Sequence, residues 1–248
     1  SGALQPISEV ASECQKHGIL FHTDAAQAVG KVDVSLDALG GPDMVTIVGH
    51  KFGASKGVAA LYIRPGCLSE HGRSEPVLYG GAGALLLGGG QEQGRRAGTE
   101  NVPHIVGMGR AAELLLMDEG QRWKNNAKKM EHLRTRLLDS LTRHLGKNVV
   151  RPNGPSDPSV RLPNTLSVGL RNVQGGELLK RIQNEVAASA GSACHASGGK
   201  VSSILLAMKV PMEYAGGTLR LSVGPTTTEE EIDEAVDIIV REAKRQLE

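Results

Sequence analysis

The stretch that decides the fold reads Phe-His-Thr-Asp-Ala-Ala-Gln-Ala-Val-Gly at residues 21–30, and Gly-His-Lys follows at residues 49–51. An apolar run at residues 19–22 leads into the first motif and another at residues 44–48 leads into the second, so each predicts a short buried strand. If these strands are parallel neighbours in an open α/β sheet, both motifs project from their carboxyl ends, where such sheets bind ligands.

The two motifs carry the groups that pyridoxal phosphate (PLP) requires. This cofactor needs an amine that holds it as a Schiff base, an acid beside its pyridine nitrogen and a donor near its ring oxygen. Lys51, Asp24 and Gln27 supply these three groups. Taken alone, Asp24 is better explained as a helix N-cap and Lys51 as a solvated loop lysine. Their joint placement at two strand ends favours the cofactor site.

Length and charge exclude several classes of protein. The 248 residues can bury a sizeable core as one large or two modest domains. Lys and Arg number 28 against 27 for Asp and Glu, so no surface for nucleic acid is indicated. No apolar run is long enough to cross a bilayer, so no membrane association is expected.

The three cysteines, Cys14, Cys67 and Cys194, cannot all pair with one another, and their spacing matches no zinc pattern. We therefore expect no metal site and a reducing compartment. The cytoplasm is the simplest location, with a mitochondrial one left open.

The remainder of the chain alternates helices and strands. Expected helices occupy residues 6–17, 176–184, 202–208 and 228–246, and residues 105–144 form a longer helical region. Expected strands occupy residues 58–63, 165–170 and 218–223. Prolines and glycines from Pro152 to Pro158 indicate loops. We place a domain boundary near residue 116, within the long helical region, which gives domains 1–115 and 116–248.

One cysteine stands in a loop of small residues, Gly-Ser-Ala-Cys-His-Ala-Ser-Gly-Gly at residues 191–199. A free cysteine is commonly a small buried hydrophobe, and this interpretation suits Cys14 on the apolar face of the first helix. Around Cys194 the glycines and serines argue against burial, and His195 adds positive charge that favours the thiolate.

In their order along the chain, these segments resemble the NifS-like cysteine desulfurases and selenocysteine lyases of the class V aminotransferase superfamily. The resemblance is carried by the segments at residues 22–31, 49–51, 56–62, 88–92, 96–101, 191–194 and 219–224. It implies an α/β fold of the PLP-dependent transferase type, similar to aspartate aminotransferase. The expected parts are a partial large domain with a mainly parallel sheet and a smaller C-terminal α/β domain.

The resemblance also implies roles for individual residues in binding PLP. Lys51 forms the Schiff base, Asp24 pairs with the pyridine nitrogen, and Gln27 contacts the ring oxygen. His50 lies by the phosphate, and Thr99 reaches the phosphate of a neighbouring subunit in a homodimer.

The implied reaction takes sulfur or selenium from L-cysteine or L-selenocysteine and releases L-alanine. Arg220 binds the substrate carboxylate through a bidentate fork. The alternative interpretation of Arg220 is a surface arginine at the end of a strand. Cys194 accepts the chalcogen as a persulfide or selenopersulfide, which a sulfur or selenium acceptor protein can collect for iron-sulfur cluster or selenium metabolism. The dipeptide Cys194-His195 resembles selenocysteine lyases.

Two alternatives remain open. One is another class V aminotransferase-type PLP enzyme without a loop thiol, and the other is a catalytically silent, truncated chain that pairs with another subunit. The chain departs from the family at Val48, which replaces a serine that donates to the phosphate, and at residues 52–56, which replace a proline-containing run. Because Ser1-Gly2 reads as the middle of a domain, the family's N-terminal part is expected to be missing.

Overall fold

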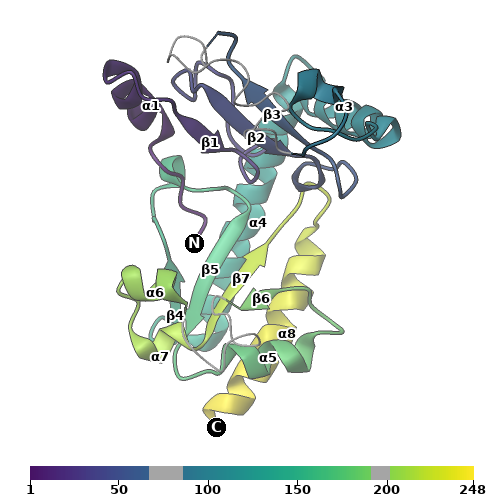
Figure 1. Cartoon of the computed structure of the whole chain (residues 1–248). Helices are drawn as coiled ribbons and strands as arrows, with labels where there is room; N and C mark the ends of the chain where they lie inside the picture. The colour runs from purple at the N-terminus through teal and green to yellow at the C-terminus, as the bar shows by residue number, and fades with distance from the viewer. Residues whose placement is uncertain (67–85, 191–201) are drawn as a thin grey trace. The chain divides into compact units, whose positions relative to one another are not determined.

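A computed structural model describes residues 1–66, 86–190 and 202–248 of the chain. These residues form two compact units (Figure 1). The first unit is Pro6–Lys124, and the second joins Ser1–Gln5 to Asn125–Glu248. The units divide after Lys124, whereas the sequence placed the domain boundary near residue 116.

The first unit contains a three-stranded sheet in the order β1-β2-β3. Strand β1 (His22–Asp24) pairs in parallel with β2 (Met44–Val48), as the sequence predicted. Strand β3 (Ala59–Ile63) is antiparallel to β2, so the sheet is mixed where a mainly parallel one was expected. The connection over residues 49–58 explains the difference, because a parallel partner would require a longer crossover, usually with a helix.

The first strand is shorter than its apolar run suggests. The backbone of Phe21 bonds to Asp43, with its N–H donating to Oδ2 at 2.9 Å and its carbonyl accepting from the Asp43 N–H at 3.0 Å. Ladder pairing with β2 therefore begins at His22, opposite Met44.

Helices and two short turns complete the first unit. They are α1 (Ile7–Lys16), the 3-10 turns η1 (Gly49–Lys51) and η3 (Gln91–Gly94), and α3 (Val102–Leu116). A small core forms where Ile7 of α1 packs near Ala25, Leu39 and Val45. The helical region expected at residues 105–144 is divided into α3 and α4 (Gln121–Leu145). Residues 117–120 separate the two helices, and the last three of them, Asp118, Glu119 and Gly120, have positive φ.

The second unit is built on a four-stranded antiparallel sheet. Its order is β4-β5-β7-β6, and the strands span Val150–Asn153 (β4), Thr165–Leu170 (β5), Thr218–Ser222 (β7) and Ser189–Ala190 (β6). The sequence predicted β5 and β7 but assigned Pro152 and Asn153 to a loop. Because β4 lies at the edge of the sheet, Pro152 needs to donate no hydrogen bond to an outer neighbour.

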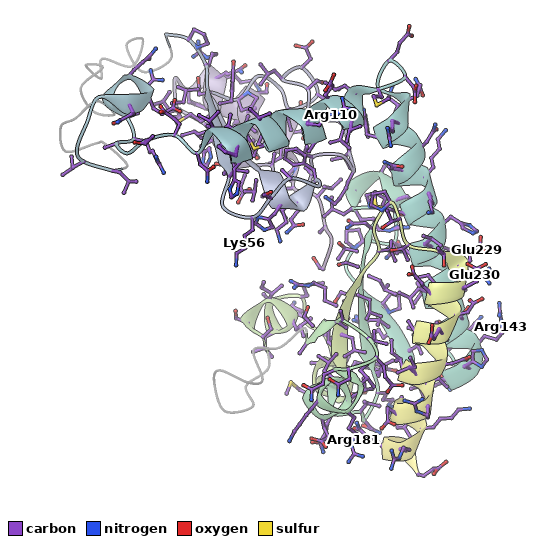
Figure 2. All side chains as sticks on the ribbon, turned by 90° about the vertical axis from the view of Figure 1, so that its right-hand side faces the viewer. Lys56, Arg110, Arg143, Arg181, Glu229 and Glu230 are labelled. Carbon is purple, nitrogen blue, oxygen red and sulfur yellow. The ribbon has the colours of Figure 1, made fainter. Side chains whose placement is uncertain are left out.

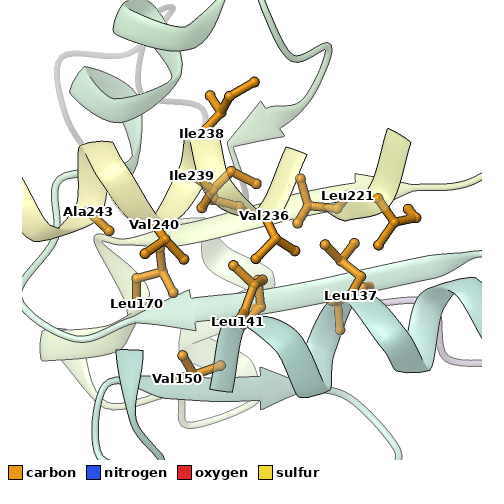
Figure 3. Close-up of a cluster of buried hydrophobic side chains, with 14 of the residues drawn as sticks. Leu137, Leu141, Val150, Leu170, Leu221, Val236, Ile238, Ile239, Val240 and Ala243 are labelled. Carbon is orange, nitrogen blue, oxygen red and sulfur yellow. The ribbon is translucent and has the colours of Figure 1, made fainter. Parts of the chain in front are cut away.

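Helices complete the second unit. Besides the part of α4 that belongs to the second unit, they are η4 (Pro158–Val160), α5 (Gly175–Ile182), α6 (Ser203–Ala207), α7 (Met212–Ala215) and α8 (Glu229–Leu247). Leu141 of α4, Ile239 of α8 and Leu170 of β5 each have no exposed surface. Figure 3 shows them in one apolar cluster. Full burial of such a side chain stabilises a fold by about 1.5–3 kcal/mol.

Charged residues hold the beginning of α8 to α4 on the surface of the second unit. Figure 2 shows Glu229 and Glu230 at the first turn of α8. Arg136 of α4 bonds to Glu229 at 2.8 Å and to Asp233 at 2.6 Å. Acidic residues in a first helical turn also interact favourably with the helix dipole.

Within the three described ranges, we find no helix that combines the length and the apolar character needed to cross a membrane.

Candidate functional site

Asp24 is the last residue of β1 and lies opposite Thr46 in the parallel ladder. Just beyond it, the Ala25 N–H donates to the Thr46 carbonyl at 2.9 Å, which is the final backbone link between these two segments. The Asp24 side chain is exposed, and its Oδ1 accepts from the Ala26 N–H at 2.8 Å. The carboxylate therefore caps the start of a turn over residues 26–31, where no helix forms, so the helix N-cap interpretation is wrong.

Gly49-His50-Lys51 forms the 3-10 turn η1 directly after β2. Gly49 is buried against the start of β3, where an added Cβ would lie 2.9 Å from Val58 Cγ1 and 3.0 Å from the Val58 carbonyl oxygen. Its N–H also donates to that carbonyl at 3.0 Å. The glycine is therefore required by close packing, and it directs His50 and Lys51 into solvent.

Because β1 and β2 are parallel, their carboxyl ends lie on the same side of the sheet, and both motifs follow these ends. We call this side, where the two strands end, the strand-end edge of the sheet. The carboxylate of Asp24, the amide of Gln27, the imidazole of His50 and the amine of Lys51 are all exposed there. In the described part of the chain, no hydrogen bond or ion pair occupies the Lys51 amine. A free amine with a carboxylate on the neighbouring strand is a donor set that fits the aldehyde and the protonated pyridine nitrogen of PLP.

Lys31 also belongs to this edge, although the sequence assigned it no role. Its Nζ donates to the Lys51 carbonyl at 3.1 Å and to the Val29 carbonyl at 3.3 Å. Burial lowers the pKa of Lys31, and the charge of Lys51 lowers it further. In the sequence, Lys31 is marked only as the last residue of the segment 22–31. That position does not predict a hydrogen bond to the backbone of residue 51.

Thr99 lies between η3 and α3 in the first unit, with its side chain exposed. Its neighbours fix this connection: the Gly98 N–H donates to Gln91 Oε1 at 3.2 Å, and Asn101 Oδ1 caps α3 by accepting from the His104 N–H. As far as the described residues go, no hydrogen bond joins Thr99 to the strand-end groups. This exposure leaves Thr99 available for the contact with a second subunit that the resemblance implies.

Arg220 belongs to the second unit, whereas Asp24 and Lys51 belong to the first. It is the middle residue of β7, where it lies between Ser167 of β5 and Ser189 of β6. Its neighbours Leu219 and Leu221 are buried, so strand alternation exposes Arg220 on the opposite face. Arg220 is therefore not a strand-end residue. Over the described ranges, no carboxylate forms an ion pair with it.

Cys194 and His195, and also Cys67, lie outside the described residues. Cys14 is described and is a partly buried free thiol on α1, in keeping with a structural role. The described residues contain no cluster of His, Cys, Asp and Glu side chains that could hold a metal ion.

Comparison with known proteins identifies the family. The aminotransferase class-V family matches residues 1–235. The cysteine desulfurase IscS of Clostridium botulinum (strain Hall) is 36% identical over 248 residues, which are 100% of this chain and 57% of that protein. Thus the chain spans little more than half the length of this relative.

Solved structures agree in fold. A NifS-like protein superposes with a TM-score of 0.78 at 32% identity, covering 97% of this chain and 57% of its own. SspA in complex with cysteine gives a TM-score of 0.64 at 30% identity, covering 92% of this chain and 56% of its own. The two units therefore have the α/β fold of PLP-dependent transferases, in part. With sequence and structure in agreement over nearly its whole length, the chain belongs to the class-V aminotransferase family, whose members depend on PLP.

Proposed function

We propose that this protein is a PLP-dependent cysteine desulfurase or selenocysteine lyase, of which this chain carries the attachment lysine, the pyridine partner and the acceptor thiol. One observation carries the proposal. The parallel pairing of β1 and β2 brings Asp24 and Lys51 to the same edge of the sheet, with Gln27 and His50 beside them.

The residues of this edge divide the work of holding the cofactor. The Lys51 amine would hold PLP, and the Asp24 carboxylate would keep the pyridine nitrogen protonated. Gln27 would donate to the ring oxygen, and His50 would contact the phosphate. When bound, PLP supplies an electron sink for the substrate carbon. Thr99 would bind the phosphate of the PLP held by the second subunit of a homodimer.

Two residues act on the substrate. The guanidinium of Arg220 binds the carboxylate of L-cysteine or L-selenocysteine by a bidentate fork. The thiolate of Cys194 attacks the substrate sulfur or selenium. The bond from this atom to the substrate carbon breaks, and its electron pair stays on the carbon. Protonation there gives L-alanine, while Cys194 keeps the chalcogen as a persulfide or selenopersulfide for an acceptor protein.

The relatives support this choice of substrate. The first matching proteins are named cysteine desulfurases, and one structural neighbour was solved with cysteine. Attack by a thiolate suits a reducing compartment, which favours the cytoplasm. Cys194 followed by His195 favours selenocysteine as a second substrate.

The first experiment tests cofactor attachment. The purified chain is incubated with PLP, reduced with borohydride, digested and analysed by mass spectrometry. We expect the pyridoxyl group on Lys51, and its loss in Lys51→Met. Lys16→Met is the matched control, because Lys16 is an exposed lysine of α1 in the same unit. A pyridoxyl group that persists elsewhere at the wild-type level in Lys51→Met would refute the assignment.

The second experiment distinguishes the reaction classes. The chain is assayed for alanine, sulfide and selenide with L-cysteine and L-selenocysteine in parallel. Full activity of Cys194→Ser on cysteine would favour a class V aminotransferase-type enzyme without a loop thiol. A chain that attaches no PLP at all would favour the catalytically silent alternative.

A further inference from the structure

We propose that Lys31 is a positioning residue of the cofactor site: its side chain ties the backbone of Lys51 to the turn that follows Asp24. The inference rests on the proposed function, because it assigns Lys31 the task of fixing the attachment lysine relative to the pyridine partner.

The need for such a tie follows from where the ladder ends. Strands β1 and β2 are paired only up to Asp24 and Thr46, with one further link from the Ala25 N–H. Beyond this point each chain segment continues into its own turn. Throughout the described residues, the bond from Lys31 Nζ to the Lys51 carbonyl is the one hydrogen bond between residues 26–34 and residues 47–56. The two catalytic motifs would otherwise meet only through packing.

The second bond of Lys31 makes the tie stiff. Its Nζ also donates to the Val29 carbonyl, two residues back in its own turn. One ammonium therefore bridges a carbonyl of each motif, and Nζ is held from both sides. Hydrogen bonds from a charged donor are stronger than those from a neutral one.

The local sequence delivers Lys31 to this place. Gly30 has a φ of +74°, and a Cβ there would lie 3.1 Å from Leu115 Cδ2. Few residues other than glycine adopt this conformation without strain. The chain turns at Gly30, and the turn is closed by the Lys31 and Val32 N–H groups, which both donate to the Ala28 carbonyl. Burial and the neighbouring charge of Lys51 lower the pKa of Lys31, which is a cost that a surface lysine would not carry.

The test compares Lys31→Met, Lys31→Arg and the control Lys16→Met with the wild-type chain. Methionine keeps the apolar stem but removes the donor, whereas arginine keeps a cationic donor. We expect the PLP dissociation constant of Lys31→Met to rise by about tenfold, since a lost charge-assisted bond is of this order. Lys31→Arg should recover most of the affinity, and Lys16→Met should match the wild type.

Hydrogen–deuterium exchange of the chain without PLP gives a second readout that is independent of cofactor binding. In Lys31→Met the amides of residues 50–54 should exchange faster, because the turn that carries Lys51 has lost its anchor. Amides of β3, which pairs with β2 in the same unit, should exchange as in the wild type, which excludes unfolding of that unit.

The outcomes are distinct. If wild-type chain attaches no PLP, the proposed function fails, while the exchange measurement still tests the tie. Unchanged exchange at residues 50–54 in Lys31→Met would overturn the inference. So would a loss of PLP affinity that Lys31→Arg does not restore, because the site would then not depend on a cationic donor.

Discussion

Asp24 and Asp33 make the same local hydrogen bond, and they differ in what lies beside them. Asp24 Oδ1 accepts from the Ala26 N–H and Asp33 Oδ1 from the Ser35 N–H, each at 2.8 Å. Both carboxylates are exposed and belong to the first unit. Only Asp24 ends a strand that pairs in parallel with the strand leading to Lys51. Comparing variants of the two residues therefore distinguishes a loss of the local turn, which both would suffer, from a loss of chemistry, which only Asp24 would suffer.

We expect Asp24→Asn to lower the rate of alanine release from cysteine by about a hundredfold or more, as loss of a preorganised charge does in other active sites. Asn retains an oxygen that accepts from the Ala26 N–H, so the turn should persist. Asp33→Asn, the matched control, should stay near the wild-type rate. Equal losses in the two variants would indicate that both act through the fold.

The acceptor thiol is a second prediction at this scale. Cys194→Ser should still attach PLP but should release little sulfur from cysteine, and Cys14→Ser should behave as the wild type. Because the thiolate is the attacking form, the rate should rise with pH as the thiol ionises. Mass spectrometry after one turnover should find the added sulfur on Cys194. Sulfur on Cys14 or Cys67, with Cys194 unmodified, would contradict the assignment.

At the scale of an element, α8 depends on its capping box. Thr228 Oγ1 accepts from the Glu231 N–H at 3.2 Å, and Glu231 Oε2 accepts from the Thr228 N–H at 2.9 Å. The helix matters because it contributes Val236 and Ile239 to the main core. The surface ion pairs of Arg136 contribute less, since exposed pairs are typically worth at most about 1 kcal/mol.

We expect Thr228→Ala to lower the free energy of unfolding of the second unit by about 1 kcal/mol, the usual cost of a lost N-cap. Thr226→Ala is the matched control, because Thr226 is exposed and lies outside the helix. Urea titration followed by circular dichroism measures both. An equal loss in the two variants would show that the cap is not the cause.

At the scale of the whole molecule, we predict a homodimer with shared active sites. Helix α3 follows Thr99, and its first turns expose two apolar side chains on one face of the helix, with 59% of Val102 and 65% of Val106 accessible. Exposed apolar groups that lie close together often mark an interface.

Subunit mixing tests the shared site. Lys51→Met and Thr99→Val chains should each have low activity, and a mixture should regain part of it. A mixed dimer has one site that takes Lys51 from the Thr99→Val chain and Thr99 from the Lys51→Met chain. Light scattering should show the dimer. A monomer with full PLP occupancy, or a mixture without recovery, would contradict the prediction.

The sequence by itself determined the elements whose signals are local. The apolar runs at residues 44–48 and 165–170 predicted β2 and β5 with the observed bounds, because β-branched and aliphatic residues there must be buried. Thr227 or Thr228, followed by glutamates, predicted the start of α8, whose N-cap is Thr228. The motifs likewise placed Asp24 at the end of β1, whereas β2 ends at Val48 and Lys51 lies in the turn η1 that follows it.

Only the tertiary structure decided what depends on partners far along the chain. Strand β4 contains Pro152 and became a strand because β5 pairs with it, although its own sequence favours a loop. The direction of β3 followed from the short connection after η1. Lys31 gained its place at the site through the carbonyl of Lys51, a contact between residues 20 positions apart. Every residue has the same backbone carbonyl, so the sequence does not indicate which carbonyl a distant lysine will bind.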